Sequence, residues 1–209
     1  MDKKAKLERE RKQLRRLETL VDSVYALVLV LIATQLPTPS EQQWAGGTIN
    51  QFWASQGEDL IPVLVGLVLV TVYWLQNNTL FGNLVRTDTI HTSVSLVQIF
   101  FVLFYLYAVT LGTDPKLEEN VDVLALQSIT AALIGIAAVA SWSYASKNRR
   151  LLSAEVTQQK ARELQVNFLV EPITALITLP CAFLGMIAWQ IAWLVYPLVA
   201  LLLKRSLIT

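Results

Sequence analysis

The sequence has little of what disulfide bonds, metal sites and catalytic centres need. Its 209 residues include one cysteine and one histidine. Cys181 therefore cannot form a disulfide within the chain, and His91 alone does not make a convincing metal site. The chain also lacks GxGxxG, Gly-x-Ser-x-Gly, Walker and CxxC motifs. We therefore expect no enzymatic activity, no cofactor and no metal site.

Charge is also scarce. Charged residues make up 16% of the chain, hydrophobic residues 54%, and the mean hydropathy is +0.48. An ordinary soluble domain carries about 25% charged residues, so this composition indicates an integral membrane protein instead. The sequence predicts an all-α membrane protein with a single domain over residues 1–209.

Hydrophobic runs predict six membrane-spanning helices in each subunit. Crossing a hydrocarbon core of about 30 Å takes about 20 helical residues. Residues 166–203 leave a choice between two short spans that turn near Gly185 and one long kinked helix. The predicted spans are about 20–36, 60–76, 93–111, 123–144, 166–184 and 187–203.

The distribution of positive charge favours the even number of spans. All lysines and arginines except Lys116 lie in the N-terminal segment 1–18, the corner after the second span, the segment 146–165 and the last residues. The positive-inside rule then places the basic N-terminal segment and both termini in the cytoplasm. An even number of crossings follows, and we predict six.

The first span carries a narrow stripe of hydroxyl and branched aliphatic side chains. At about 100° per residue, the stripe covers a strip of roughly 60° with one residue just beside it. Two interpretations stay open. The hydroxyls bond carbonyls of their own helix within an entirely apolar surface, or the stripe lines a wet path. The stripe residues are Ser23, Leu27, Val30, Leu31 and Thr34.

Arg16 and Asp22 stand at the entrance of this span. A carboxylate at the edge of a bilayer costs free energy unless it meets water, a cation or a donor, so Asp22 favours the wet path. Arg16 is an unsuitable direct partner, because six residues place it about 240° away around the helix. The two side chains are therefore joined through other helices or not joined at all.

These residues resemble the R-x-x-x-F-S-D signature that opens the first helix of the transmembrane protein 175 family, the lysosomal potassium channel and its shorter prokaryotic relatives. Here the signature reads R-L-E-T-L-V-D, with Leu20 and Val21 in place of Phe and Ser. The aliphatic run that follows and the helix plan are also similar. The resemblance implies a short prokaryotic-type member with one motif copy, in the plasma membrane.

The resemblance also implies a homotetramer with a central pore lined by the first helix. Family members gate and select at a ring of isoleucine or leucine five residues after the signature aspartate, which is Leu27 here. Such a ring acts as a hydrophobic constriction and favours K⁺ modestly, because K⁺ sheds water at lower cost than Na⁺. No span has the repeated arginines of a voltage sensor, so the expected function is a moderately selective potassium leak channel.

A supporting network is implied in the same way. Family members carry a tryptophan and a histidine near the end of the second helix that bond the signature Arg and Asp. Trp74 could match the tryptophan, whereas amides replace the histidine, and an amide can still donate to Asp22. The expected network residues are Arg16, Asp22, Trp74, Asn77 and Asn78.

Two other functions stay open. Pro180, Gly185 and Pro197 could break helices, as in a secondary transporter of a small ion or solute. Alternatively, the chain is a non-conducting membrane scaffold. The remaining carboxylate, Glu171, stands near the start of the fifth predicted span, and we expect it to reach the interface or pair with Arg162 rather than take part in conduction.

Overall fold

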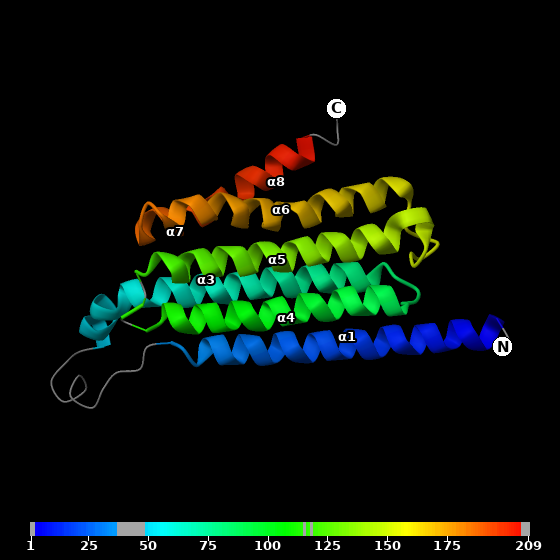
Figure 1. Cartoon of the computed structure of the whole chain (residues 1–209), viewed down its shortest axis with the longest axis horizontal. Coiled ribbons are helices and arrows are strands. Elements are labelled where there is room, and N and C mark those ends of the chain that lie inside the picture. Colours follow the sequence, from blue (N-terminus) through cyan, green and yellow to red (C-terminus); the bar gives the residue numbers. More distant parts are fainter. Residues whose placement is uncertain (1–2, 37–48, 115, 118, 206–209) are drawn as a thin grey trace.

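The computed structural model describes residues 3–36, 49–114, 116–117 and 119–205. In these ranges the chain forms long helices that run along one another, with α1 on one side of the bundle and α8 on the other (Figure 1). Two 3₁₀ turns, Lys147–Arg149 and Trp193–Val195, interrupt them. The helices are α1 (Lys3–Ala33), α3 (Ile49–Gly82), α4 (Thr89–Gly112), α5 (Val121–Ser146), α6 (Gln158–Ala182), α7 (Met186–Ala192) and α8 (Tyr196–Arg205).

Five stretches of the described chain are long and apolar enough to cross a membrane. The first helix is not among them, because the last 18 residues of α1 still contain Arg16, Glu18 and Asp22. The sixth crossing predicted from the sequence therefore falls on α1, which is not one of these five stretches. The five stretches are Val63–Gly82, Thr89–Gly112, Val121–Arg149, Gln158–Ala182 and Met186–Arg205.

Two helices are longer than the hydrophobic runs that predict them. Residues 77–82 follow the predicted second span. They lie inside α3, which continues to Gly82, and the chain turns over residues 83–88. Likewise α6 begins at Gln158, eight residues before the predicted start of the fifth span. Polar residues extend both helices because side-chain caps and neighbouring helices, and not hydrophobicity alone, decide where a helix ends.

The break between α6 and α7 lies at Gly185. Its φ of 106° is in the left-handed region, which glycine adopts without steric cost. The chain then continues through α7, a 3₁₀ turn and α8 along the outer side of α6 (Figure 1). The structure thus has the two-helix arrangement in this region, and not one long kinked helix.

Short polar residues begin the helices. Asp88 caps α4 by accepting from the backbone N–H of His91 at 3.0 Å. Thr157 caps α6 by accepting from the backbone N–H of Lys160 at 3.1 Å. These bonds satisfy N–H groups that have no partner within the helix, so each helix start is fixed by local sequence.

One face of α1 belongs to the hydrophobic core. The buried positions recur every three or four residues and pack against α3 and α4. This is the spacing of one helix face. The residues of the opposite face are exposed. The buried residues are Leu14, Leu17, Val21, Tyr25, Val28 and Ile32.

Helices α5 and α6 approach closely at Gly135. A Cβ atom at this position would lie 2.6 Å from Cδ of Pro172 and 3.0 Å from its backbone nitrogen. No side chain fits at that distance, so glycine is required here. The contact brings the middle of α6, including Glu171, into the centre of the bundle.

Candidate functional site

The five residues of the predicted stripe all lie on the exposed face of α1. Leu27 is 55% exposed and Val30 is 61% exposed, whereas Val28 and Ile32 are fully buried. The stripe therefore points away from the subunit's own bundle. Exposed aliphatic side chains on a helix of a membrane protein meet either lipid or another protein surface.

The two hydroxyls of the stripe bond their own helix. Ser23 Oγ donates to the carbonyl of Thr19 at 2.7 Å, and Thr34 Oγ1 donates to the carbonyl of Leu31 at 2.7 Å. This is the first of the two interpretations that the sequence leaves open. A hydroxyl that donates in this way still has lone pairs for water or a cation, so these bonds are compatible with both interpretations.

Asp22 is held by the second helix of the bundle. Trp74 Nε1 donates to Asp22 Oδ1 at 3.0 Å, which joins α3 to α1 across 52 positions of sequence. The carboxylate is half-buried. A donor from another helix is what a carboxylate needs at such a position, and the bond fixes the exposed stripe relative to α3.

Asn77 takes a different partner from the one expected. It donates to the hydroxyl of Tyr25 at 2.9 Å and to the carbonyl of Tyr73 at 3.0 Å, and not to Asp22. Side chains on a helix lean toward its N-terminus, so the hydroxyl of Tyr25 reaches back along α1 toward the level of Asn77. Of the two amides expected to be able to donate to Asp22, Asn77 therefore takes other partners.

The other two expected network residues stand apart. Arg16 is exposed on α1, and the ion pairs in the described part of the chain do not include it. Asn78 is half-buried, one position beyond Asn77 on α3. The network that the structure forms is thus smaller than expected and includes Tyr25, which the sequence did not single out.

A second polar cluster, at the end of the bundle where the chain turns over residues 83–88, also escaped sequence analysis. Arg86 Nη1 lies 3.2 Å from Glu10 Oε2, and Arg86 Nη2 donates to the carbonyl of Arg150 at 3.0 Å. These contacts join α1, the turn at residues 83–88 and the loop after α5, which lie at one end of the molecule (Figure 1). Residues so distant in sequence give no local signal of their contact.

Asp88 connects the same end to α5. The hydroxyl of Tyr144 donates to Asp88 Oδ2 at 2.8 Å, and Arg150 Nη1 donates to that hydroxyl at 2.7 Å. Burial raises the pKa of Asp88, but the hydrogen bonds from the His91 backbone and from Tyr144 outweigh it and leave the pKa below the ordinary value. Asp88 is therefore held as a carboxylate.

His91 has a structural environment. It is fully buried, with Nδ1 at 2.9 Å from Thr87 Oγ1 and Nε2 at 3.0 Å from Ser141 Oγ. Both ring nitrogens are therefore occupied by hydroxyls, which joins α4 to α5. No group of three metal-binding side chains occurs among the described residues.

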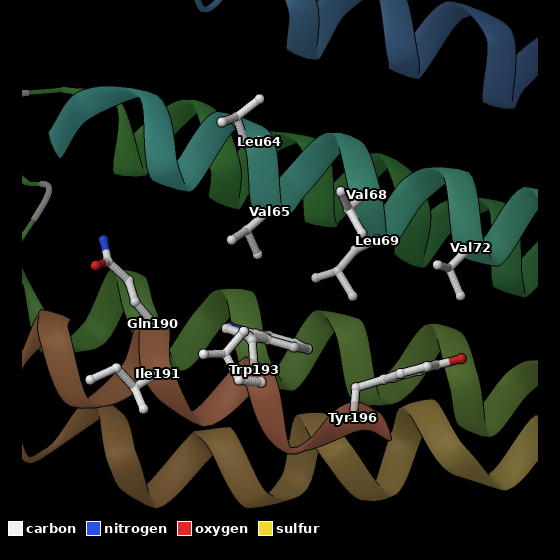
Figure 2. Close-up of a pocket in the computed structure, with 10 residues that line it drawn as sticks. Leu64, Val65, Val68, Leu69, Val72, Gln190, Ile191, Trp193 and Tyr196 are labelled. Carbon is white, nitrogen blue, oxygen red and sulfur yellow. The ribbon is translucent and has the colours of Figure 1, made fainter. Parts of the chain in front are cut away.

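An apolar groove of about 560 Å³ lies between α3 and the α7–α8 segment (Figure 2). Most of its wall is aliphatic, with an amide at one place and a phenol at another. Its composition suits hydrocarbon rather than water or ions. It is lined by Leu64, Val65, Val68, Leu69, Val72, Gln190, Ile191, Trp193, Leu194 and Tyr196.

Comparisons of sequence point to one family. The family described as "Endosomal/lysosomal potassium channel TMEM175" matches residues 16–105. A curated protein from Marivirga tractuosa, described as "Potassium channel", is 29% identical over 96 residues. That alignment covers 46% of this chain and 36% of the relative, so the chain spans little more than a third of that protein.

Comparisons of structure extend the likeness to the rest of the chain. A crystal structure of a lysosomal potassium-selective channel TMEM175 homolog from Chamaesiphon minutus has a TM-score of 0.71 at 15% identity, and covers 94% of this chain and 98% of that one. The potassium channel MtTMEM175, as its T38A variant in complex with a nanobody fusion, has a TM-score of 0.61 at 20% identity, with 91% and 92% covered. At these identities the likeness concerns the fold, which therefore includes α5 to α8 as well as the matched sequence.

Proposed function

This chain is a relative of the transmembrane protein 175 family of potassium channels, and from this premise we propose that it is a subunit of a potassium channel lined by α1. The family is one of channels and not of enzymes. The observation that carries the proposal is the division of α1 into a buried face and an exposed stripe. A helix anchored by one face presents the other to a shared central path.

We propose a homotetramer. One chain offers one exposed stripe and cannot enclose a path, whereas copies around a closed symmetry axis can. In this arrangement α1 supplies the sixth crossing. Its 31 residues are about 46 Å long, and its charged inner half lies in the cytoplasm next to the other basic segments. Both termini are then cytoplasmic, in the plasma membrane of a prokaryote.

The constriction is assigned to Leu27. Four leucines around the axis offer no oxygens to replace the hydration shell of an ion, so a narrow ring resists wetting and favours K⁺ modestly. Thr34 and Val30 or Leu31 form rings toward the outside, and Ser23 forms one toward the inside. The absence of repeated arginines from each predicted span supports a leak channel with little voltage dependence.

The bond between Trp74 and Asp22 positions this helix. It lies about one turn before Leu27 on α1 and fixes the rotation of the helix about its axis. Successive residues of a helix point about 100° apart. If the bond were lost and α1 rotated about its axis by one position, every residue of the stripe would point away from the proposed pore. Asp22 is in this proposal a positioning residue at the cytoplasmic mouth of the pore.

Reconstitution in liposomes tests the proposal. We expect K⁺ flux that exceeds Na⁺ flux, and we expect Leu27→Ala to raise conductance or to weaken selectivity. Leu176→Ala is the matched control, because Leu176 is 52% exposed on α6 and lies outside the stripe. Equal effects of the two variants would overturn the pore assignment.

The same assay distinguishes the two alternatives. A secondary transporter moves ions at turnover rates far below those of a channel, and a scaffold moves none. Absence of flux from intact tetramers would therefore favour a scaffold. Slow flux that saturates with substrate would favour a transporter.

A further inference from the structure

Glu171 lies deep inside the subunit. It is 1% exposed and stands 13 residues after the first residue of α6, about 20 Å along the helix. The expected pairing with Arg162 is wrong, since Arg162 is exposed and the described ion pairs do not include Glu171. The prediction failed because α6 begins at Gln158, which moves Glu171 from the interface to the middle of the helix.

Polar but uncharged groups surround the carboxyl. The hydroxyl of Tyr196 on α8 donates to Oε1 at 3.4 Å. The side-chain amide of Gln76 on α3 acts as a donor to the carboxyl, and Tyr25 on α1 and Tyr73 on α3 lie within electrostatic range. None of these groups is a cation. The described residues thus supply no positive charge to balance an ionised Glu171.

Two oxygen atoms of this cluster have no hydrogen-bond donor. Glu171 Oε2 and Gln76 Oε1 are both buried, and neither has a hydrogen-bond partner. Tyr73 already gives its hydrogen to the carbonyl of Ala131 at 2.8 Å, and the hydroxyl of Tyr25 accepts from Asn77 and forms no hydrogen bond to either of these oxygens among the described residues. Buried oxygens without donors are costly, and a hydrogen carried on Oε2 would remove the charge from the oxygen that has no donor.

We propose that Glu171 is a proton-binding site, with the proton carried on the unpartnered Oε2, beside the side-chain amide of Gln76. The carboxylate takes the proton from a hydronium ion of the solvent, which leaves as water, and becomes a neutral carboxylic acid, so no counter-charge is needed in the membrane interior. This assignment concerns the interior of one subunit, behind the buried face of α1, and is separate from the proposed path at the stripe.

A proton fits this site better than a metal cation. A bare cation needs a full shell of oxygens, whereas the cluster offers one carboxyl, one amide oxygen and a phenol that donates to the carboxyl. The adjoining groove reaches Tyr196 with a mostly aliphatic wall and offers few further ligands (Figure 2). A proton needs only one carboxyl oxygen, and the unpartnered Oε2 of Glu171 supplies it.

Infrared spectroscopy of the full chain in lipid nanodiscs at neutral pH tests the site. We expect the C=O stretching band of a protonated carboxylic acid in the wild type. Glu171→Gln should remove this band, and Glu163→Gln should leave it, because Glu163 is an exposed carboxyl on the same helix. Gln76→Leu should shift the band to higher frequency, since the carboxyl would lose its hydrogen bond with the Gln76 amide.

Three outcomes would overturn the proposal. The acid band could be absent, it could survive Glu171→Gln, or it could appear only after K⁺ is removed, which would identify a cation site. If Glu171→Gln fails to fold, carbon-13 labelling of glutamate and the shift in Gln76→Leu decide instead. If the frequency of the labelled band were the same in Gln76→Leu as in the wild type, the site would be contradicted. None of these measurements uses ion flux, so the result is independent of the proposed channel function.

Discussion

Asn77 donates its hydrogen bond to the hydroxyl of Tyr25 at 2.9 Å, while Trp74, three residues earlier on α3, donates to Asp22 at 3.0 Å. Two adjacent turns of α3 thus hold two adjacent turns of α1. The two acceptors are Asp22 and Tyr25, and neither belongs to the exposed stripe that contains Leu27. The exposed stripe is positioned by bonds that it does not itself make.

The first prediction concerns Trp74. Trp74→Phe keeps an aromatic ring but removes the N–H that Asp22 accepts. We expect a loss of about 1–2 kcal/mol in the free energy of unfolding, because the bond is to a carboxylate and half-buried. Denaturant titration of the wild type, Trp74→Phe, Asp22→Ala and the double variant measures it. Additive effects of the two substitutions would show that the bond contributes nothing.

The second prediction compares two valines of α1. Val28 is fully buried and Val30 is 61% exposed. Val28→Ala should cost about 2 kcal/mol, because it leaves a cavity between α1 and its neighbours. Val30→Ala should change the stability of the dissociated subunit by less than about 0.5 kcal/mol. Thermal unfolding in a detergent that separates the subunits checks both, and equal losses would contradict the two-faced description of α1.

The third prediction concerns the pH dependence of stability and the carboxylate of Asp88. The pKa of Asp88 is lower in the folded chain than the ordinary value of 3.8. Its contribution to stability is therefore complete above the ordinary value and is lost as the pH falls through the lower folded pKa. Asp88→Asn should be less stable than the wild type near neutral pH, and the difference should shrink below about pH 4.

Unfolding of both proteins between pH 7 and pH 3 measures that effect. Glu155→Gln serves as the control, because Glu155 is exposed in the loop before α6, and its stability should follow the wild type throughout. A constant gap between wild type and Asp88→Asn at all pH values would mean that the charge of Asp88 does not matter.

The fourth prediction concerns the contact between α5 and α6. Gly135→Ala places a methyl group 2.6 Å from the ring of Pro172, so one helix must move. We expect a loss of about 1–3 kcal/mol. Gly82→Ala is the control, since nothing lies within 4 Å of a Cβ there, and it should be neutral or slightly stabilising. If Gly135→Ala proved as stable as Gly82→Ala, the close approach would be disproved.

Local patterns explain how much the sequence could predict. The spacing of apolar residues predicts helices around the five apolar stretches, and the period of α1 predicts which residues share a face with Leu27. These signals are contained within one turn or one helix. The resemblance supplied Trp74 as a candidate partner of Asp22, which spacing alone would not have singled out.

Contacts between helices could not be predicted in the same way. The depth of Glu171 depends on how closely α6 packs against α5, where Gly135 meets Pro172. The partner of Asn77 depends on how far α1 and α3 are shifted along each other. The cluster of Asp88, Tyr144 and Arg150 depends on two turns that meet only after the bundle forms. The spacing of apolar residues within one segment does not predict any of these contacts.

The separation of the two faces of α1 also has an evolutionary consequence. Residues that build the subunit, such as Tyr25 and Ile32, and residues that face outward, such as Leu27 and Val30, do not overlap. Mutation can therefore explore new side chains on the outward face without putting the fold at risk. A scaffold of this kind is able to diversify by drift along one stripe, while the selection that preserves its architecture acts on the other.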